Sequence, residues 1–197
     1  FSFFGDEEEA FAKMRAGFQP DVSSPCSYKI NHWNDAGMLA EIDSGRLSNW
    51  GEMIPSLTNV PDTIHDGKRL WVCVDWGQTS ITYRTDLVDI EEESSGLMWD
   101  ERYAGRLSMI DSLIDGVMVA AIYGGAKDPY NMTTEEVAMA KDLLKKQLPL
   151  LRFYSNSMTD VEQALASGEL VAAVTWNSSA LELNNQGQRV RFMVPKE

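Results

Sequence analysis

Two short apolar runs, each leading to a tryptophan, form the clearest hydrophobic pattern in the chain. Residues 170–175 lead to Trp176, and residues 70–74 lead to Asp75 and Trp76. Runs of this length predict buried strands of a parallel sheet. Because open α/β sheets bind ligands at the carboxyl ends of their strands, we expect both tryptophans to line a small-molecule site.

Further short strands and helices alternate along the chain, which is typical of an α/β fold. Strands are expected at residues 1–4, 39–42, 81–84, 106–110 and 190–194. Helices are expected at residues 7–17, 27–36, 113–123, 133–147, 159–168 and 179–185. Two of these helices are predicted to begin with capping boxes, Thr133 with Glu136 and Thr159 with Glu162.

The charge balance argues against one class of partner. The 197 residues include 17 Lys and Arg against 30 Asp and Glu, which gives a formal net charge of -13. Nucleic acid is not expected as a partner, because phosphate binding needs a basic surface. The negative charge of the surface favours a cationic ligand, although the acidic composition could also serve solubility alone. No apolar stretch approaches the roughly 20 residues that span a bilayer, so we expect no membrane insertion.

The sequence lacks the motifs of the common catalytic and cofactor sites. It contains no nucleophile elbow, phosphate-binding loop, zinc-protease motif or dinucleotide fingerprint. His32 and His65 have no acid or thiol at a useful spacing, which favours structural or surface roles. Cys26 and Cys73 lack metal-type spacing. We therefore predict no cofactor, no metal and no catalytic residue.

Several carboxylates and one tyrosine are candidates for binding a ligand. Asp111, Ser112 and Asp115 follow an expected strand and open an expected helix, where Ser112 could equally serve as a helix cap. Asp75 would be costly to bury unpaired, so either a protein cation or a ligand cation should meet it. Tyr28 could face the same site or belong to the core. Aromatic faces beside carboxylates are the groups that bind an organic ammonium ion.

Short motifs that follow one order along nearly the whole chain carry a family resemblance. They are EEAFAKMRAG at 8–17, DVSSPCSY at 21–28, AGMLAEID at 36–43, WGQT at 76–79, WD at 99–100, YAGRL at 103–107, ASGE at 166–169, WNSSA at 176–180 and FMVPKE at 192–197. In this order they resemble the periplasmic spermidine/putrescine-binding proteins of bacterial ABC transporters. These belong to the larger group of extracellular solute-binding proteins.

The resemblance implies a two-lobed α/β clamp of the type II periplasmic-binding-protein kind. Lobe 1 would comprise residues 1–82, lobe 2 residues 83–190, and residues 191–197 a second hinge strand that returns to lobe 1. Bending would take place at residues 81–85 and 193–195. The resemblance also implies that the chain is an internal fragment, without the family's first strand and C-terminal part.

The resemblance further implies which residues line the cleft between the lobes. By position they are Tyr28, Trp76, Ser112, Asp115 and Trp176, with Cys26 where many relatives have serine. Ser112 stands at a site that often holds a second carboxylate in the family. Asp111 and Asp75 lie close in sequence to these positions and are the expected sources of the missing charge.

The expected function is that of a monomeric, periplasmic binding protein whose signal peptide has been removed. It would bind a polyamine and deliver it to the membrane permease of an ABC importer. Alternatives within the same fold are an amino-acid-like solute, a ferric ion or an anion. The chain has no adjacent tyrosine pair for ferric ion, and the acids at 111–115 disfavour an anion. The alternative outside binding proteins is a hydrolase with Asp111 and Asp115 as its acid–base pair.

Overall fold

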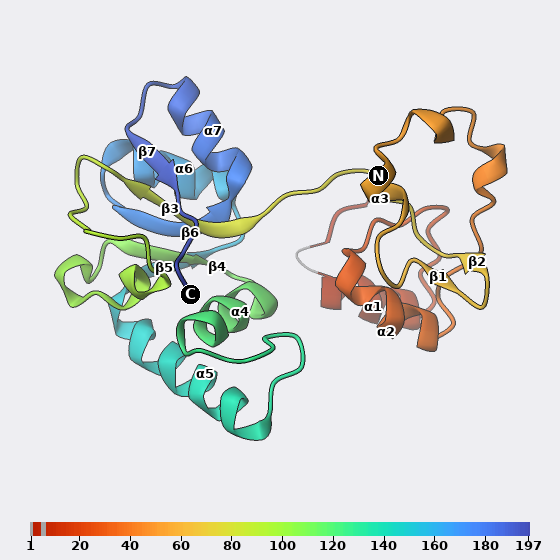
Figure 1. Ribbon diagram of the computed structural model, residues 1–197, viewed down its shortest axis with the longest axis horizontal. Helices are drawn as coiled ribbons and strands as arrows, with labels where there is room; N and C mark the ends of the chain where they lie inside the picture. Colours follow the sequence, from red (N-terminus) through yellow and green to blue (C-terminus); the bar gives the residue numbers. More distant parts are fainter. Residues whose placement is uncertain (1, 5–6) are drawn as a thin grey trace. The chain divides into compact units, whose positions relative to one another are not determined.

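The computed structural model describes residues 2–4 and 7–197, which divide into two compact units, Phe1–Trp76 and Gly77–Glu197 (Figure 1). The expected strand at residues 1–4 lies partly outside the described residues, and residues 2–4 form no strand. The unit boundary follows Trp76, earlier in the chain than the expected lobe boundary at residue 82. The division into lobes and hinges stays a prediction.

The first unit consists of short elements joined by long irregular segments. Its helices and strands are α1 (Glu7–Arg15), α2 (Ile30–Asp35), α3 (Pro55–Thr58), β1 (Ile64–His65) and β2 (Lys68–Arg69), with 3₁₀ turns η1 (Ser27–Lys29), η2 (Ser44–Arg46) and η3 (Trp50–Glu52). Three glutamates occupy the first turn of α1, where the helix dipole favours negative charge. Ala10 and Phe11 of α1 pack against the buried Trp33 of α2. This cluster is the core of the first unit.

A tight hairpin precedes the first tryptophan-bearing segment. β1 pairs with β2 in antiparallel register, and the turn between them places Asp66 and Gly67 at positive φ, as a two-residue hairpin requires. Residues 70–74, which were expected to form a buried strand, are irregular. Leu70 and Cys73 are buried, but no described strand pairs with this segment. An apolar run without a hydrogen-bonding neighbour gains burial but not strand structure.

The second unit is built around a mixed sheet with the order β5-β4-β6-β3-β7. Its strands are β3 (Thr79–Arg84), β4 (Leu107–Ile110), β5 (Leu151–Ser155), β6 (Ala172–Trp176) and β7 (Val190–Phe192). Its helices are α4 (Leu113–Tyr123), α5 (Thr134–Gln147), α6 (Met158–Ser167) and α7 (Asn177–Asn185), with η4 (Ser95–Trp99), η5 (Glu101–Tyr103) and η6 (Leu148–Leu150). β4 runs parallel to β5 and β6, whereas β3 runs antiparallel to β6 and β7.

Helices cover both faces of this sheet (Figure 1). α4 and α5 lie on one face, and α6 and α7 lie on the other. The larger core cluster includes the fully buried Met98, Leu107 and Met109, while the other face buries Leu165 and Leu183 of α6 and α7. Strands buried on both faces are expected to be apolar throughout, which explains the run that precedes Trp176.

Helix starts in the second unit agree with the sequence, with one exception. Thr133 and Glu136 form the predicted capping box of α5. At α6 the capping side chain is Ser157, which accepts a hydrogen bond from the N–H of Asp160, so the capping box predicted at Thr159 is wrong. α6 ends at Gly168, whose φ of 80° is the left-handed conformation that glycine adopts easily.

Candidate functional site

The carboxyl ends of three neighbouring strands meet at one edge of the sheet in the second unit. β4, β5 and β6 run parallel and end there, and α4, α6 and α7 begin there. We call this region the strand-end edge and define it by the side chains exposed or half-buried at these ends: Asp111, Ser112, Asp115, Tyr154, Ser155 and Trp176. Ligands of open α/β sheets bind at such an edge.

Asp111 lies at the centre of the strand-end edge. Its N–H donates a hydrogen bond of 2.9 Å to the carbonyl oxygen of Ser155 at the end of β5. On the other side, β4 pairs in parallel with β6, with Leu107 opposite Ala172 and Ser108 opposite Ala173, so Asp111 and Trp176 come at the same end of two neighbouring strands. Neighbouring strands lie about 4.8 Å apart. Asp111 therefore follows a strand whose neighbour in the sheet ends in Trp176.

Ser112 and Asp115 show how the start of α4 is stabilised. The Ser112 hydroxyl accepts a 3.5 Å hydrogen bond from the N–H of Asp115, so Ser112 is the N-cap of the helix. Within the residues that the structure describes, the carboxylates of Asp111 and Asp115 form no ion pair. The edge therefore carries negative charge that no described protein cation neutralises.

Trp176 ends β6 and is 50% exposed, which is unusual for so large an apolar side chain. The backbone around it is held firmly, because Asn177 bonds to Gln78 twice. The N–H of Asn177 donates to the Gln78 carbonyl oxygen at 3.0 Å, and the Asn177 side chain accepts from the Gln78 N–H at 3.1 Å. A fixed backbone with a half-exposed indole is a suitable wall for a flat or cationic ligand.

The sequence analysis did not identify Tyr154, which also lies at the strand-end edge. This residue is 41% exposed, and both partial burial and the negative charge of Asp111 raise its pKa. Tyr154 was not predicted as a site residue because the strand that carries it, β5, was not predicted. The available signal in the sequence was the apolar–polar–apolar alternation Leu151-Arg152-Phe153, which is the pattern of a strand with one exposed face, and the structure shows the matching alternation of burial along β5.

Two predicted site residues of the first unit lie at the start of η1. Cys26 precedes this turn and donates its N–H to a carboxylate oxygen of Glu7, while Tyr28 within the turn is 45% exposed. The indole N–H of Trp71 donates to the carbonyl oxygen of Pro25 at 2.8 Å. This bond ties the segment that carries Cys26 and Tyr28 to the segment that leads to Trp76.

The other two predicted residues of the first unit are exposed at its end. Trp76 is 69% exposed, and Asp75 is also on the surface. The thiol of Cys73 donates to the Asp75 carbonyl oxygen at 3.0 Å, and burial together with the Asp75 charge raises the pKa of that thiol. Cys73 is a free thiol. The structure thus brings Asp111, Ser112, Asp115 and Trp176 to one end of the sheet in the second unit, and the contribution of all eight predicted residues to one site stays a prediction.

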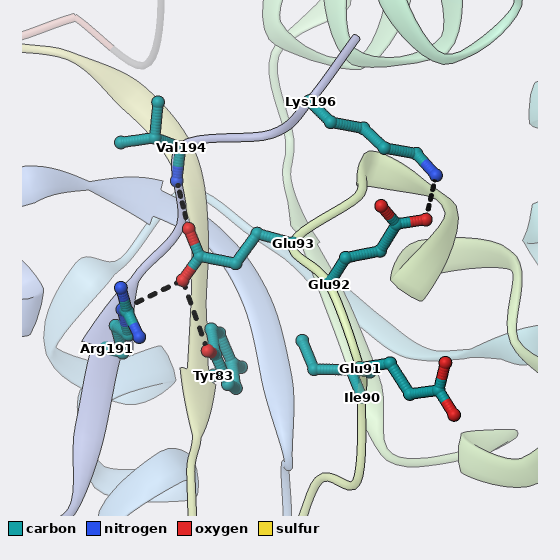
Figure 2. A pocket seen from close by; sticks show the side chains of 8 residues that line it. All are labelled: Tyr83, Ile90, Glu91, Glu92, Glu93, Arg191, Val194 and Lys196. Atoms are coloured by element: carbon teal, nitrogen blue, oxygen red, sulfur yellow. Dashed lines mark hydrogen bonds and ion pairs between the residues drawn. The ribbon is translucent and has the colours of Figure 1, made fainter.

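A separate hollow in the second unit contains none of the predicted site residues. Figure 2 shows its lining, in which Glu93 is central. Glu93 accepts hydrogen bonds from the Tyr83 hydroxyl at 3.2 Å and the Val194 N–H at 3.0 Å, and it pairs with Arg191 at 2.9 Å (Figure 2). Lys196 pairs with Glu92. Because Glu93 is satisfied by these partners, the contacts around this hollow join residues 191–196 to the acidic loop at 91–93.

Two further observations concern metals and membranes. Across residues 2–4 and 7–197, no three His, Cys, Asp or Glu side chains gather closely enough to bind a metal ion. The described helices also include none with both the length and the apolar character to cross a bilayer.

Comparison with known proteins gives the family. The family model for bacterial extracellular solute-binding proteins matches residues 4–197. A putrescine/agmatine-binding protein of Pseudomonas aeruginosa is 29% identical over 180 residues, which are 82% of this chain and 48% of that protein. The spermidine/putrescine-binding periplasmic protein of Escherichia coli is 25% identical over 205 residues, covering 100% of this chain and 56% of its own length. The chain thus spans about half the length of these relatives.

A solved structure is similar as well. The spermidine/putrescine substrate-binding protein of a Streptococcus pneumoniae ABC transporter superposes with a TM-score of 0.72 at 18% identity, over 96% of this chain and 58% of that one. This likeness confirms the predicted α/β fold of the two-lobed solute-binding proteins. The chain belongs to the family of bacterial extracellular solute-binding proteins, which are binding proteins rather than enzymes.

Proposed function

We propose that this chain is part of a solute-binding protein of an ABC importer and that its ligand is a polyamine such as putrescine or spermidine. The observation that carries the proposal is the strand-end edge, where Asp111, which forms no ion pair among the described residues, and the half-exposed Trp176 stand at the ends of neighbouring strands. A carboxylate supplies charge-assisted hydrogen bonds to an ammonium group, and an indole face supplies cation–π attraction.

The surroundings of this edge favour a cation over other solutes. Asp115 adds a second carboxylate in the first turn of α4, and the chain as a whole has a formal net charge of -13. Such a field raises the local concentration of cations and repels anions. A neutral solute can donate hydrogen bonds to Asp111 and Asp115, but it leaves their negative charge without a counter-ion.

The proposed mechanism is closure of two lobes around the ligand. In the second lobe the ligand would contact Asp111, Ser112, Asp115 and Trp176. In the first lobe it would contact Cys26, Tyr28, Asp75 and Trp76. A ligand that touches both lobes stabilises the closed state by its differential affinity for that state. The proposed hinges are residues 81–85 and 193–195, between lobes at 1–82 and 83–190.

The proposed cellular role follows from the relatives. Proteins with this family's fold and similar sequences are named as periplasmic polyamine-binding proteins. We therefore propose a monomeric periplasmic protein, exported with a signal peptide that is then removed, which presents its ligand to a membrane permease.

The test is a titration of the full-length protein with putrescine, spermidine, agmatine, ferric ion, an amino acid mixture and a neutral sugar. Isothermal calorimetry would measure affinity, and thermal unfolding would measure ligand-induced stabilisation, which grows with ligand concentration above Kd. Saturable binding of polyamines without chemical change of the ligand is the expected result. Binding of another solute and of no polyamine would replace the proposed ligand class by that of the bound solute. Turnover of any ligand would contradict a binding function.

A further inference from the structure

Tyr154 occupies a position from which its ring can reach the strand-end edge. β5 is the edge strand of the sheet, and its register pairs Tyr154 with Met109 of β4. Successive side chains of a strand point to opposite faces. Phe153 packs against the cluster formed with α6 and α7, so Tyr154 lies on the face that α4 and α5 cover (Figure 1).

The start of α4 lies on this same face. Met109, the neighbour of Tyr154 in the register, reaches Gly116 in α4, since a Cβ added at Gly116 would lie 3.8 Å from the Met109 methyl carbon. Asp111 follows β4 and immediately precedes α4, and its backbone is bonded to Ser155, the residue after Tyr154. Tyr154 is therefore next to Asp111 through the backbone of two paired strands.

The side chain of Tyr154 is also available for a ligand. It is 41% exposed, and the described residues give its hydroxyl no hydrogen-bond partner. The raised pKa of its phenol, caused by partial burial and then by the charge of Asp111, is consistent with a neutral phenol close to that carboxylate. Tyr154 and Asp111 thus combine an exposed aromatic ring with an unpaired carboxylate, as Trp176 and Asp111 do.

We propose that Tyr154 is a ligand-contacting residue that determines specificity, forming a second aromatic wall on the β5 side of Asp111. This inference rests on the proposed function. The strand order β5-β4-β6 places Asp111 between the strands that carry Tyr154 and Trp176. A cationic group held by Asp111 then contacts the indole on one side and the phenol on the other.

This arrangement selects a particular chemical class of ligand. The carboxylate of Asp111 binds an ammonium or guanidinium group, and the two rings cover that group and the first methylenes of an unbranched chain. A guanidinium group benefits most, because it is planar, weakly hydrated and stacks on aromatic faces. The class is therefore a primary ammonium or guanidinium ion on an unbranched alkyl chain.

The experiment compares variants of the full-length protein by calorimetric titration with putrescine and agmatine. Tyr154→Ala is expected to weaken binding about two- to fivefold, as loss of one exposed cation–π contact does. Tyr154→Phe keeps the ring and should bind within about twofold of the wild type. Tyr130→Ala removes another exposed tyrosine and should leave affinity unchanged.

The outcomes separate this inference from the proposed function. If the wild type binds no polyamine, both fail. If the wild type binds and Tyr154→Ala binds equally well, only the role of Tyr154 is refuted, and equal losses in the Ala and Phe variants would refute the ring contact. Should Tyr154→Ala fail to fold, Tyr154→Leu keeps an apolar side chain without a ring and is expected to show the same loss.

Discussion

Replacement of Trp176 by alanine tests the central feature of the candidate site. A tryptophan side chain buries up to about 250 Å² when it is fully covered. Trp176 is 50% exposed, so roughly 100 Å² of its ring is open to a ligand at the strand-end edge. If the methylenes of a polyamine cover about 50 Å² of that area, burial contributes about 1.2 kcal/mol at 25 cal/mol/Å².

The charge of the ligand adds to this burial. A cation over an indole face contributes about 0.5–2 kcal/mol, depending on how far the contact is desolvated. The lower end applies to an exposed site, so the total loss in Trp176→Ala is at least about 1.5 kcal/mol, or about tenfold in Kd. The free energy of unfolding should fall as well, because the covered half of the side chain, roughly 100 Å², contributes up to about 2.5 kcal/mol to folding at 25 cal/mol/Å².

Calorimetric titration of the full-length protein with putrescine and spermidine measures the change in Kd. Chemical denaturation without ligand measures the change in the free energy of unfolding. Leu181→Ala is the matched control, because it removes an exposed apolar side chain from α7, which begins directly after Trp176. Unchanged affinity in Trp176→Ala, with Leu181→Ala also unchanged, would refute the placement of the ligand at the strand-end edge. A loss of folding stability without any loss of affinity would identify Trp176 as part of the scaffold.

Three further predictions concern the second unit. Gly124→Ala should destabilise the protein by about 1 kcal/mol in chemical denaturation, because the new Cβ would lie 1.9 Å from the Met139 sulfur, which must move. Ser157→Ala should cost about 1 kcal/mol in the same assay through loss of the α6 cap. Arg84 lowers the pKa of Asp86 to about 2, so this carboxylate stabilises the fold above its unfolded pKa of about 3.9 and ceases to do so as the pH falls through about 2. The melting temperatures of the wild type and Asp86→Asn should differ at neutral pH and converge in acid.

Local chemistry allowed the helices of the second unit to be predicted well. The cap at Ser112, the capping box at Thr133 and the left-handed Gly168 each act within a few residues of the helix end that they stabilise. The α6 start was misplaced because Ser157 and Thr159 both carry a hydroxyl group. Ser157 is the cap because its backbone is extended, at φ -109° and ψ 105°, which aims its side chain at the first turn.

Strands were harder to predict because their stability depends on partners elsewhere in the chain. Residues 70–74 are as apolar as the run at 170–175, yet only the latter has neighbours on both sides, β4 and β3. β5 has only one neighbour, and its exposed positions hold Arg152 and Tyr154, so it lacks a continuous apolar run. The omission of β5 is also why Tyr154 was absent from the predicted site.

The partial positive charges of the helix starts oppose the carboxylates at the strand-end edge, and their sum decides whether this edge favours a cation. α4, α6 and α7 all begin there, and each helix start carries a partial charge of about +0.5, which gives about +1.5 in total. Asp115 and Asp160 lie in the first turns of α4 and α6, and Asp111 precedes α4, so the carboxylates contribute -3. The balance of about -1.5 exceeds what helix capping requires. Asp111 lies outside the helix turns, and it is therefore the acid whose charge is most available to a ligand.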